Sequence, residues 1–121
     1  GLVGSEMCIR DRLIALALSN YALELLISGS EPDDITLEKA LASCSKAYSI
    51  YQLPIFLYDL AVVAEISGKR NMAMDFYDKF LNEHLRYKLN AVDRVILTNR
   101  DVNKAVDEAK SKLSKLGLLI C

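Results

Sequence analysis

Apolar residues recur along most of this chain at spacings of three and four positions, the period of α-helices with one buried face. No stretch rich in Val, Ile and Thr alternates with polar residues for long enough to predict a strand. The pattern predicts helices over 13–27, 36–51, 54–68, 71–83 and 101–116, with a further short apolar segment at 89–97. We therefore expect an all-α protein of about five or six helices arranged as antiparallel pairs.

Loop and cap residues divide the first four predicted helices. The clearest loop is 28–34, which combines a Gly, a Pro and short polar side chains, and Thr36 after it is the expected N-cap. Pro54 suits a helix start, because its missing N–H needs no partner there. Gly68 is expected to end the third helix as a C′ residue, and Asn71 is expected to cap the fourth.

The last predicted helix has boundary signals of its own. Thr98 and Asp101 resemble a capping pair ahead of it. Gly117 is expected to stop it.

The first twelve residues differ in kind from the rest. Residues 2–11, with the first two codon bases of Arg12, resemble the in-frame translation of an end sequence used in transposase-based DNA libraries. We therefore expect 1–12 to be an adapter-derived scar and 13–121 to be the native domain, whose natural N-terminus is then missing. The segment from Glu6 to Arg12 would not resist helix formation, so the first helix can recruit scar residues.

The charge balance gives no argument for nucleic acid or a membrane as partner. The chain has 15 Lys and Arg residues against 16 Asp and Glu, a formal net charge of −1, and setting 1–12 aside removes two of each sign. Both kinds of partner favour basic clusters, whereas the positive charges here are scattered apart from four Lys near the end. Hydrophobic residues make up 52% of the chain, which suits the packed core of one small domain.

Cysteine usage predicts neither a disulfide framework nor a metal site. Outside the first twelve residues the cysteines are Cys44 and Cys121, too far apart in sequence for either pattern. We therefore expect no metal and no cofactor, and free thiols favour a reducing, cytoplasmic location. The apolar run 13–27 is shorter than the roughly 20 apolar residues that a membrane span needs.

Paired helices call for a search for an internal repeat. Three apolar positions of the second predicted helix have counterparts 33 positions later on the fourth helix. Ala40, Cys44 and Ala47 correspond to Ala73, Tyr77 and Phe80. The segment 54–83 resembles one tetratricopeptide repeat, with large and small apolar residues at that family's spacing. Its repeat-packing positions are Leu57, Leu60, Ala61, Ala64, Gly68, Ala73, Tyr77 and Phe80. The resemblance implies a TPR-like α-solenoid fragment in which small residues let paired helices approach closely.

The flanking copies match less well. The copy at 13–51 has a turn about nine residues longer than the family's. A third copy, at 87–116, carries Arg100 where the family prefers Gly and Asp93 where it prefers a small residue. We expect this third copy to be a degenerate repeat or a capping pair that covers the last exposed face.

Tetratricopeptide arrays bind peptides or helices of other proteins on the concave surface lined by the first helix of each pair. The resemblance implies a partner-binding groove that comprises Asn20, Leu23, Ile55, Tyr58, Val62, Glu65, Asn90 and Arg94. For Ile55 and Val62 the alternative is burial against the first helix. One subclass grips a terminal carboxylate with Lys, Arg and Asn, but the middle repeat has Tyr58, Asp59 and Val62, so an apolar or helical partner segment is favoured.

The residues give little support for catalysis. The single histidine, His84, lies at a predicted helix end without a Cys, a Ser motif or a second His nearby, so we expect it to face solvent. Asp33 and Asp34 precede a helix, where acids more often serve as caps than as general acid and base. The glycines are isolated and form no phosphate-binding loop. We therefore expect a protein that is not an enzyme.

Two hypotheses about function stay open. The first is a protein-interaction scaffold that binds a protein or peptide partner. The second is a C-terminal helical regulatory or dimerisation domain of a larger enzyme or transcription regulator whose N-terminal part is missing. Because a repeat buries its apolar face only against its neighbours, we also expect the isolated chain to self-associate through the apolar first helix.

Overall fold

The computed structural model describes residues 2–27, 33–98 and 100–120, and these form six helices and no strand. The helices are α1 (Leu2–Ile27), α2 (Asp34–Ile50), α3 (Ile55–Ile66), α4 (Arg70–Arg86), α5 (Ala91–Ile96) and α6 (Val102–Ile120). The all-α prediction is confirmed. Most of the predicted loop at 28–34 lies outside the described residues.

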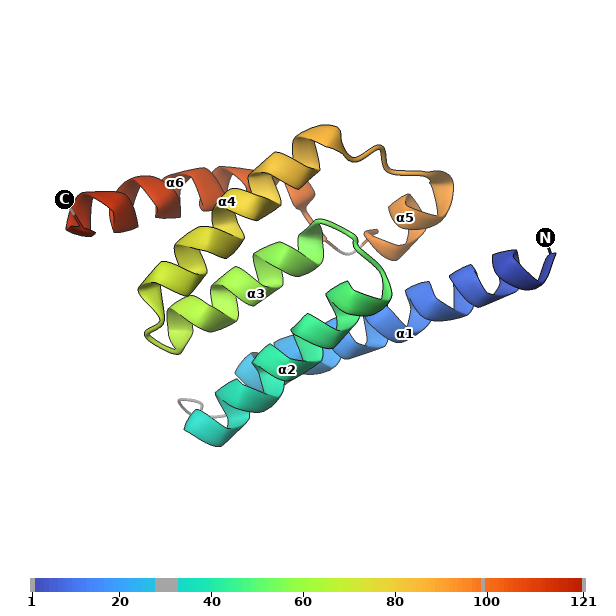
Figure 1. Ribbon diagram of the computed structural model, residues 1–121, viewed down its shortest axis with the longest axis horizontal. Coiled ribbons are helices and arrows are strands. Elements are labelled where there is room, and N and C mark those ends of the chain that lie inside the picture. Colours follow the sequence, from blue (N-terminus) through green and yellow to red (C-terminus); the bar gives the residue numbers. More distant parts are fainter. Residues whose placement is uncertain (1, 28–32, 99, 121) are drawn as a thin grey trace.

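Consecutive helices pack against one another as a chain of antiparallel hairpins. From α1 to α4 each helix runs back along the one before it, and α3 lies between α2 and α4 (Figure 1). Farther along the chain, α6 packs against α4 and also contacts α3. The result is a stack in which α3 has neighbours on several sides.

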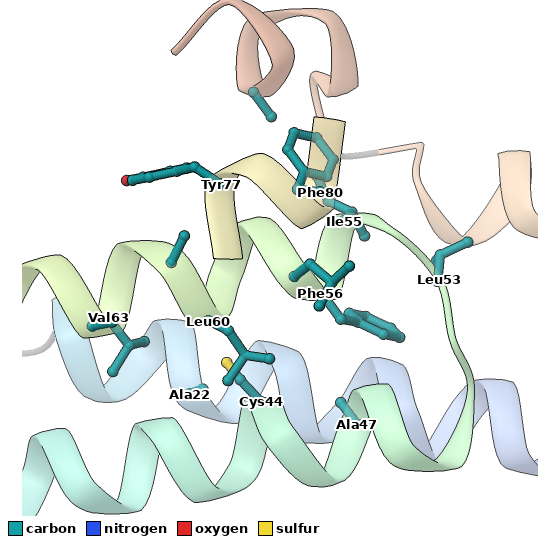
Figure 2. Packing of buried hydrophobic residues seen from close by; sticks show 14 of the residues in the cluster. Ala22, Cys44, Ala47, Leu53, Ile55, Phe56, Leu60, Val63, Tyr77 and Phe80 are labelled. Atoms are coloured by element: carbon teal, nitrogen blue, oxygen red, sulfur yellow. The ribbon is translucent and has the colours of Figure 1, made fainter. Parts of the chain in front are cut away.

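This central position of α3 explains its composition. Eight of its twelve residues are buried, because the helix is apolar nearly all round and is covered from both flanks. Phe56 and Leu60 point from α3 toward α2, where Cys44 and Ala47 lie (Figure 2). Small residues such as Ala47 leave room for the large side chains opposite, which is how a helical core reaches native packing density.

The predicted starts of α2 and α4 are two residues and one residue too late, respectively. Helix α2 begins at Asp34, and its N-cap is Asp33, whose carboxylate accepts a hydrogen bond from the Thr36 amide at 2.7 Å. Thr36 therefore lies inside the first turn. Helix α4 begins at Arg70, so Asn71 is inside that helix rather than its cap.

Of the two glycine predictions, the one for Gly68 is confirmed and the one for Gly117 is wrong. Gly68 follows α3 with φ at +79°, the left-handed conformation expected of a C′ residue. Gly117, in contrast, does not stop α6, which continues to Ile120. A glycine in a helix interior costs only about 1 kcal/mol relative to Ala, too little to end a helix flanked by good helix formers.

The predicted antiparallel pair at 87–116 is not formed. Helix α5 has six residues, and α6 packs against α4 and α3 instead of pairing with α5. The predicted capping pair is formed only in part, since the Asp101 carboxylate alone caps α6 by accepting from the Lys104 amide at 2.9 Å. Thr98, however, bonds back to carbonyls of the preceding turn and so closes α5.

Helix α1 extends well beyond the predicted start at residue 13. It begins at Leu2 and so includes nearly all of the segment that resembles adapter translation. Within the described part of the chain, no helix is both long and apolar enough to cross a membrane.

Candidate binding groove between α3, α4 and α6

An open pocket of about 610 Å³ lies where α6 approaches α3 and α4. Its walls combine aliphatic, aromatic and charged side chains. They are Tyr58, Val62, Glu65 and Ile66 of α3, Tyr77 of α4, and Glu108, Ser111, Lys112 and Lys115 of α6. The pocket forms because α6, rather than α5, packs against α4.

Hydrogen bonds and an ion pair fix the charged wall of this pocket. Glu65 accepts from the Tyr77 hydroxyl at 2.8 Å and pairs with the Lys112 ammonium at 2.9 Å. Glu108 accepts a hydrogen bond from the Tyr58 hydroxyl. Both carboxylates of the pocket are thus already engaged by side chains of the protein.

The aromatic side of the pocket is continuous with the core. The Tyr58 ring lies 6.0 Å from that of Tyr77 and 5.6 Å from that of Phe80, in tilted arrangements typical of aromatic pairs. Burial, reinforced by the bonds to Glu108 and Glu65, raises the pKa of the Tyr58 and Tyr77 hydroxyls. Both hydroxyls therefore stay protonated and remain donors.

The structure brings together three of the predicted groove residues and buries a fourth. Tyr58, Val62 and Glu65 all line the pocket. Ile55 is 3% exposed and belongs to the core, so its prediction as a contact residue is wrong. The position faces inward because the start of α3 is covered by its neighbours on both sides.

The remaining predicted groove residues lie elsewhere. Asn20 is exposed and Leu23 half-buried on α1, away from the pocket wall. Asn90 is the N-cap of α5, where its side chain accepts from the Asp93 amide at 2.8 Å. Arg94 is exposed on α5 and is not part of this pocket. Placing Asn90 and Arg94 in the groove assumed a full-length helix in this region, and α5 is too short to supply one.

The eight residues predicted to pack the middle repeat occupy structural positions. Seven of them are buried, with exposures of 3% or less, and Gly68 forms the turn between α3 and α4. Tyr77 and Phe80 lie on the side of α3 opposite to Phe56 (Figure 2).

The sequence pattern does not predict the buried ion pair between Asp59 and Arg100. The Asp59 carboxylate, on α3 and 1% exposed, is held by two guanidinium nitrogens of Arg100 at 2.6 and 3.2 Å and by the Ser19 hydroxyl at 2.7 Å. Burial lowers the pKa of Arg100, but the hydrogen bond and charge of Asp59 outweigh it and raise the net value. This cluster joins α1, α3 and the segment before α6.

A second buried acid attaches α5 to the rest of the protein. The Asp93 carboxylate accepts hydrogen bonds from the hydroxyls of Tyr51 and Tyr87, which are the C-cap residues of α2 and α4. The Arg12 guanidinium lies 5.0 Å from the centre of the Tyr51 ring. Asp93 therefore connects α5 to the C-terminal ends of α2 and α4.

No group of three or more His, Cys, Asp or Glu residues suited to a metal ion occurs in the described part of the chain. Cys44 is fully buried, and burial raises the pKa of its thiol to about 12, so it stays protonated at neutral pH. His84 lies in the last turn of α4 and is half-buried, with its ring 5.8 Å from that of Phe80, so it faces solvent only in part.

No protein-family model matches this chain, and no curated protein or solved structure matches it either. The tetratricopeptide resemblance therefore stays a prediction from the sequence. What the chain binds must be inferred from its own residues and contacts.

Proposed function

We propose that this chain is a protein-interaction module that binds a peptide segment of a partner protein in the pocket between α3, α4 and α6. The observation that supports the proposal is the pocket itself, which contains Tyr58, Val62 and Glu65. The tetratricopeptide resemblance implies a groove that contains the same three residues.

The side chains of the pocket define the chemistry of the partner segment. Val62, Ile66 and the Tyr58 ring offer an apolar surface for one side chain of a peptide. Glu65 is neutralised by Lys112, and Glu108 accepts a hydrogen bond from Tyr58 but keeps its negative charge. Lys115 is exposed and forms no ion pair within the described residues, so its ammonium group is open to an acidic ligand.

A peptide with an apolar side chain next to an Asp or Glu fits these features best. The apolar side chain would cover Val62, and the carboxylate would lie against Lys115. A charge at the rim contributes chiefly to specificity and association rate, so most affinity should come from the apolar contact.

Selection from a random peptide library displayed on phage, with the intact chain as bait, tests this proposal. We expect enrichment of peptides that carry an apolar residue beside an acid. The dissociation constant of a selected peptide should rise at least tenfold with Val62→Glu, which places a charge in the apolar part of the pocket. Lys115→Glu should weaken acidic peptides and shift a new selection toward basic ones.

Ile35→Glu is the matched control, because Ile35 is 64% exposed on α2 and lies outside the pocket. Each variant should keep the helical circular dichroism of the original chain. Failure to enrich any peptide, or equal binding by the Val62→Glu variant, would overturn the proposal.

The second hypothesis, a regulatory or dimerisation domain of a larger protein, gains support from a different surface. Large apolar side chains are exposed on α1, on the side away from the bundle. A dimerisation role would use that face and leave the pocket open, so the two functions are separable by experiment.

A further inference from the structure

One face of α1 is exposed along about four helical turns. Leu13, Ile14 and Tyr21 are 57%, 42% and 49% exposed, whereas Ala15 and Ala22 are fully buried against the bundle. The exposed face consists of Arg10, Leu13, Ile14, Ala17, Asn20, Tyr21 and Glu24. Spacings of three and four residues keep these side chains on one stripe.

This stripe, which we call the α1 outer face, has a symmetry of its own. Ala17 is at its centre, and each residue before it has a counterpart at the same number of positions after it. The pairs are Ile14 with Asn20, Leu13 with Tyr21, and Arg10 with Glu24. The two ends of the face therefore carry opposite charges, about 21 Å apart along the helix axis.

We propose that the α1 outer face is the interface of a two-fold dimer of this chain, with two α1 helices antiparallel and the axis at Ala17. A two-fold interface is self-complementary, so each contact is made twice. Arg10 of one copy faces Glu24 of the other, and Leu13 packs against Tyr21. The small Ala17 side chains at the axis let the two helices approach closely.

Charge selects this orientation over the parallel one. Parallel α1 helices would place Arg10 beside Arg10 and Glu24 beside Glu24, and like charges in contact are unfavourable. Within the described residues neither side chain forms an ion pair in the single copy. Of the seven residues of the face, Arg10 alone belongs to the segment that resembles adapter translation. The apolar centre therefore does not depend on that segment, whereas the charge pairing that selects the orientation is a property of the chain with Arg10 present.

Charge exchange tests the proposal on the intact chain by sedimentation equilibrium. Arg10→Glu alone and Glu24→Arg alone should each raise the dimer dissociation constant roughly tenfold, because two attractive pairs become repulsive. The double variant restores both pairs and should dimerise like the original chain. An equal mixture of the two single variants should also form a dimer, because both contacts between unlike copies are then attractive.

Two further variants locate the interface. Leu13→Asp should abolish dimerisation, whereas Leu85→Asp, at a position 84% exposed on α4, should leave it unchanged. With Cys8 and Cys121 replaced by Ser, Ala17→Cys should form a disulfide between copies under oxidation, since the axis brings this position next to itself. Ile35→Cys, the control for random collision, should not.

A chain that stays monomeric up to about 1 mM would overturn the proposal. So would a dimer that survives Leu13→Asp, fails to cross-link at Ala17→Cys, or is not restored by the double charge exchange. None of these outcomes bears on peptide binding in the pocket between α3, α4 and α6, because the two surfaces share no residue.

Discussion

The buried ion pair between Asp59 and Arg100 gives the sharpest test of how the helices are held together. Replacing Arg100 by Met removes the cation bonded to Asp59, whose side chain is 1% exposed, against 20% for Arg100. The carboxylate is then left with the Ser19 hydroxyl as its donor. Removing one member of a buried pair costs about 3–5 kcal/mol, because the remaining charge stays desolvated and unpaired.

Because the Arg100 side chain retains some contact with water, we expect a loss of about 3 kcal/mol, the lower end of that range. Natural domains have unfolding free energies of about 5–15 kcal/mol, so the effect should be large. Urea unfolding followed by circular dichroism measures the loss. Arg94→Met is the matched control, since Arg94 is exposed and forms no ion pair among the described residues.

A double-mutant cycle separates the buried charge from general loss of packing. Asp59→Asn should destabilise the original chain, because Arg100 loses its charged acceptor. In the Arg100→Met background the same change should instead stabilise, because a neutral amide is cheaper to bury than an unpaired carboxylate. A loss below about 1 kcal/mol for Arg100→Met, as for an exposed pair, would show that the buried charge pair is not what stabilises this contact. So would further destabilisation by Asp59→Asn in that background.

Other expectations concern caps, turns, pH and the origin of the first residues. Asp33→Ala should lower the urea midpoint at pH 7 but not at acid pH. The hydrogen bond from Thr36 lowers the pKa of Asp33 in the folded state. The stability that this cap contributes is therefore present above the ordinary value of 3.8 and is lost as pH falls through the lower folded value. Gly68→Ala should cost about 1 kcal/mol in unfolding free energy, because a β-carbon is strained at positive φ. Stability should fall as pH rises above 9, where the unfolded Cys44 thiol ionises but the folded thiol, with its pKa raised to about 12, does not; Cys44→Ala should flatten this slope. Sequencing the source locus across the codon for Leu13 should reveal no codons for residues 2–11, and their presence would contradict the adapter interpretation.

Local pattern was enough to predict the helices but not their ends. Apolar spacing and loop residues identified all of the longer helices, because an amphipathic face is a local property of the sequence. Their starts were less certain, since Asp33 and Thr36 are both acceptable caps and only the folded loop decides between them. Gly117 was misjudged because a glycine signals a helix end only when the chain turns there.

The groove could be predicted only in part. The tetratricopeptide resemblance placed Tyr58, Val62 and Glu65 in a groove, but it also placed Ile55 there wrongly. Helix α3 is apolar nearly all round, so its neighbours decide which side is covered. The wall supplied by α6 and the pair between Asp59 and Arg100 join residues more than forty positions apart. The signals that could have found the pair were an acid within an apolar run and an arginine where the repeat family prefers glycine.

Amide chemical-shift mapping by NMR, with a selected acidic-apolar peptide added to the intact chain, tests the proposed binding site most directly. We expect the shift changes to concentrate on the pocket residues of α3 and α6, Val62 and Lys115 among them. Changes confined to the α1 outer face, or absent altogether at saturating peptide, would show that the peptide does not bind in this pocket.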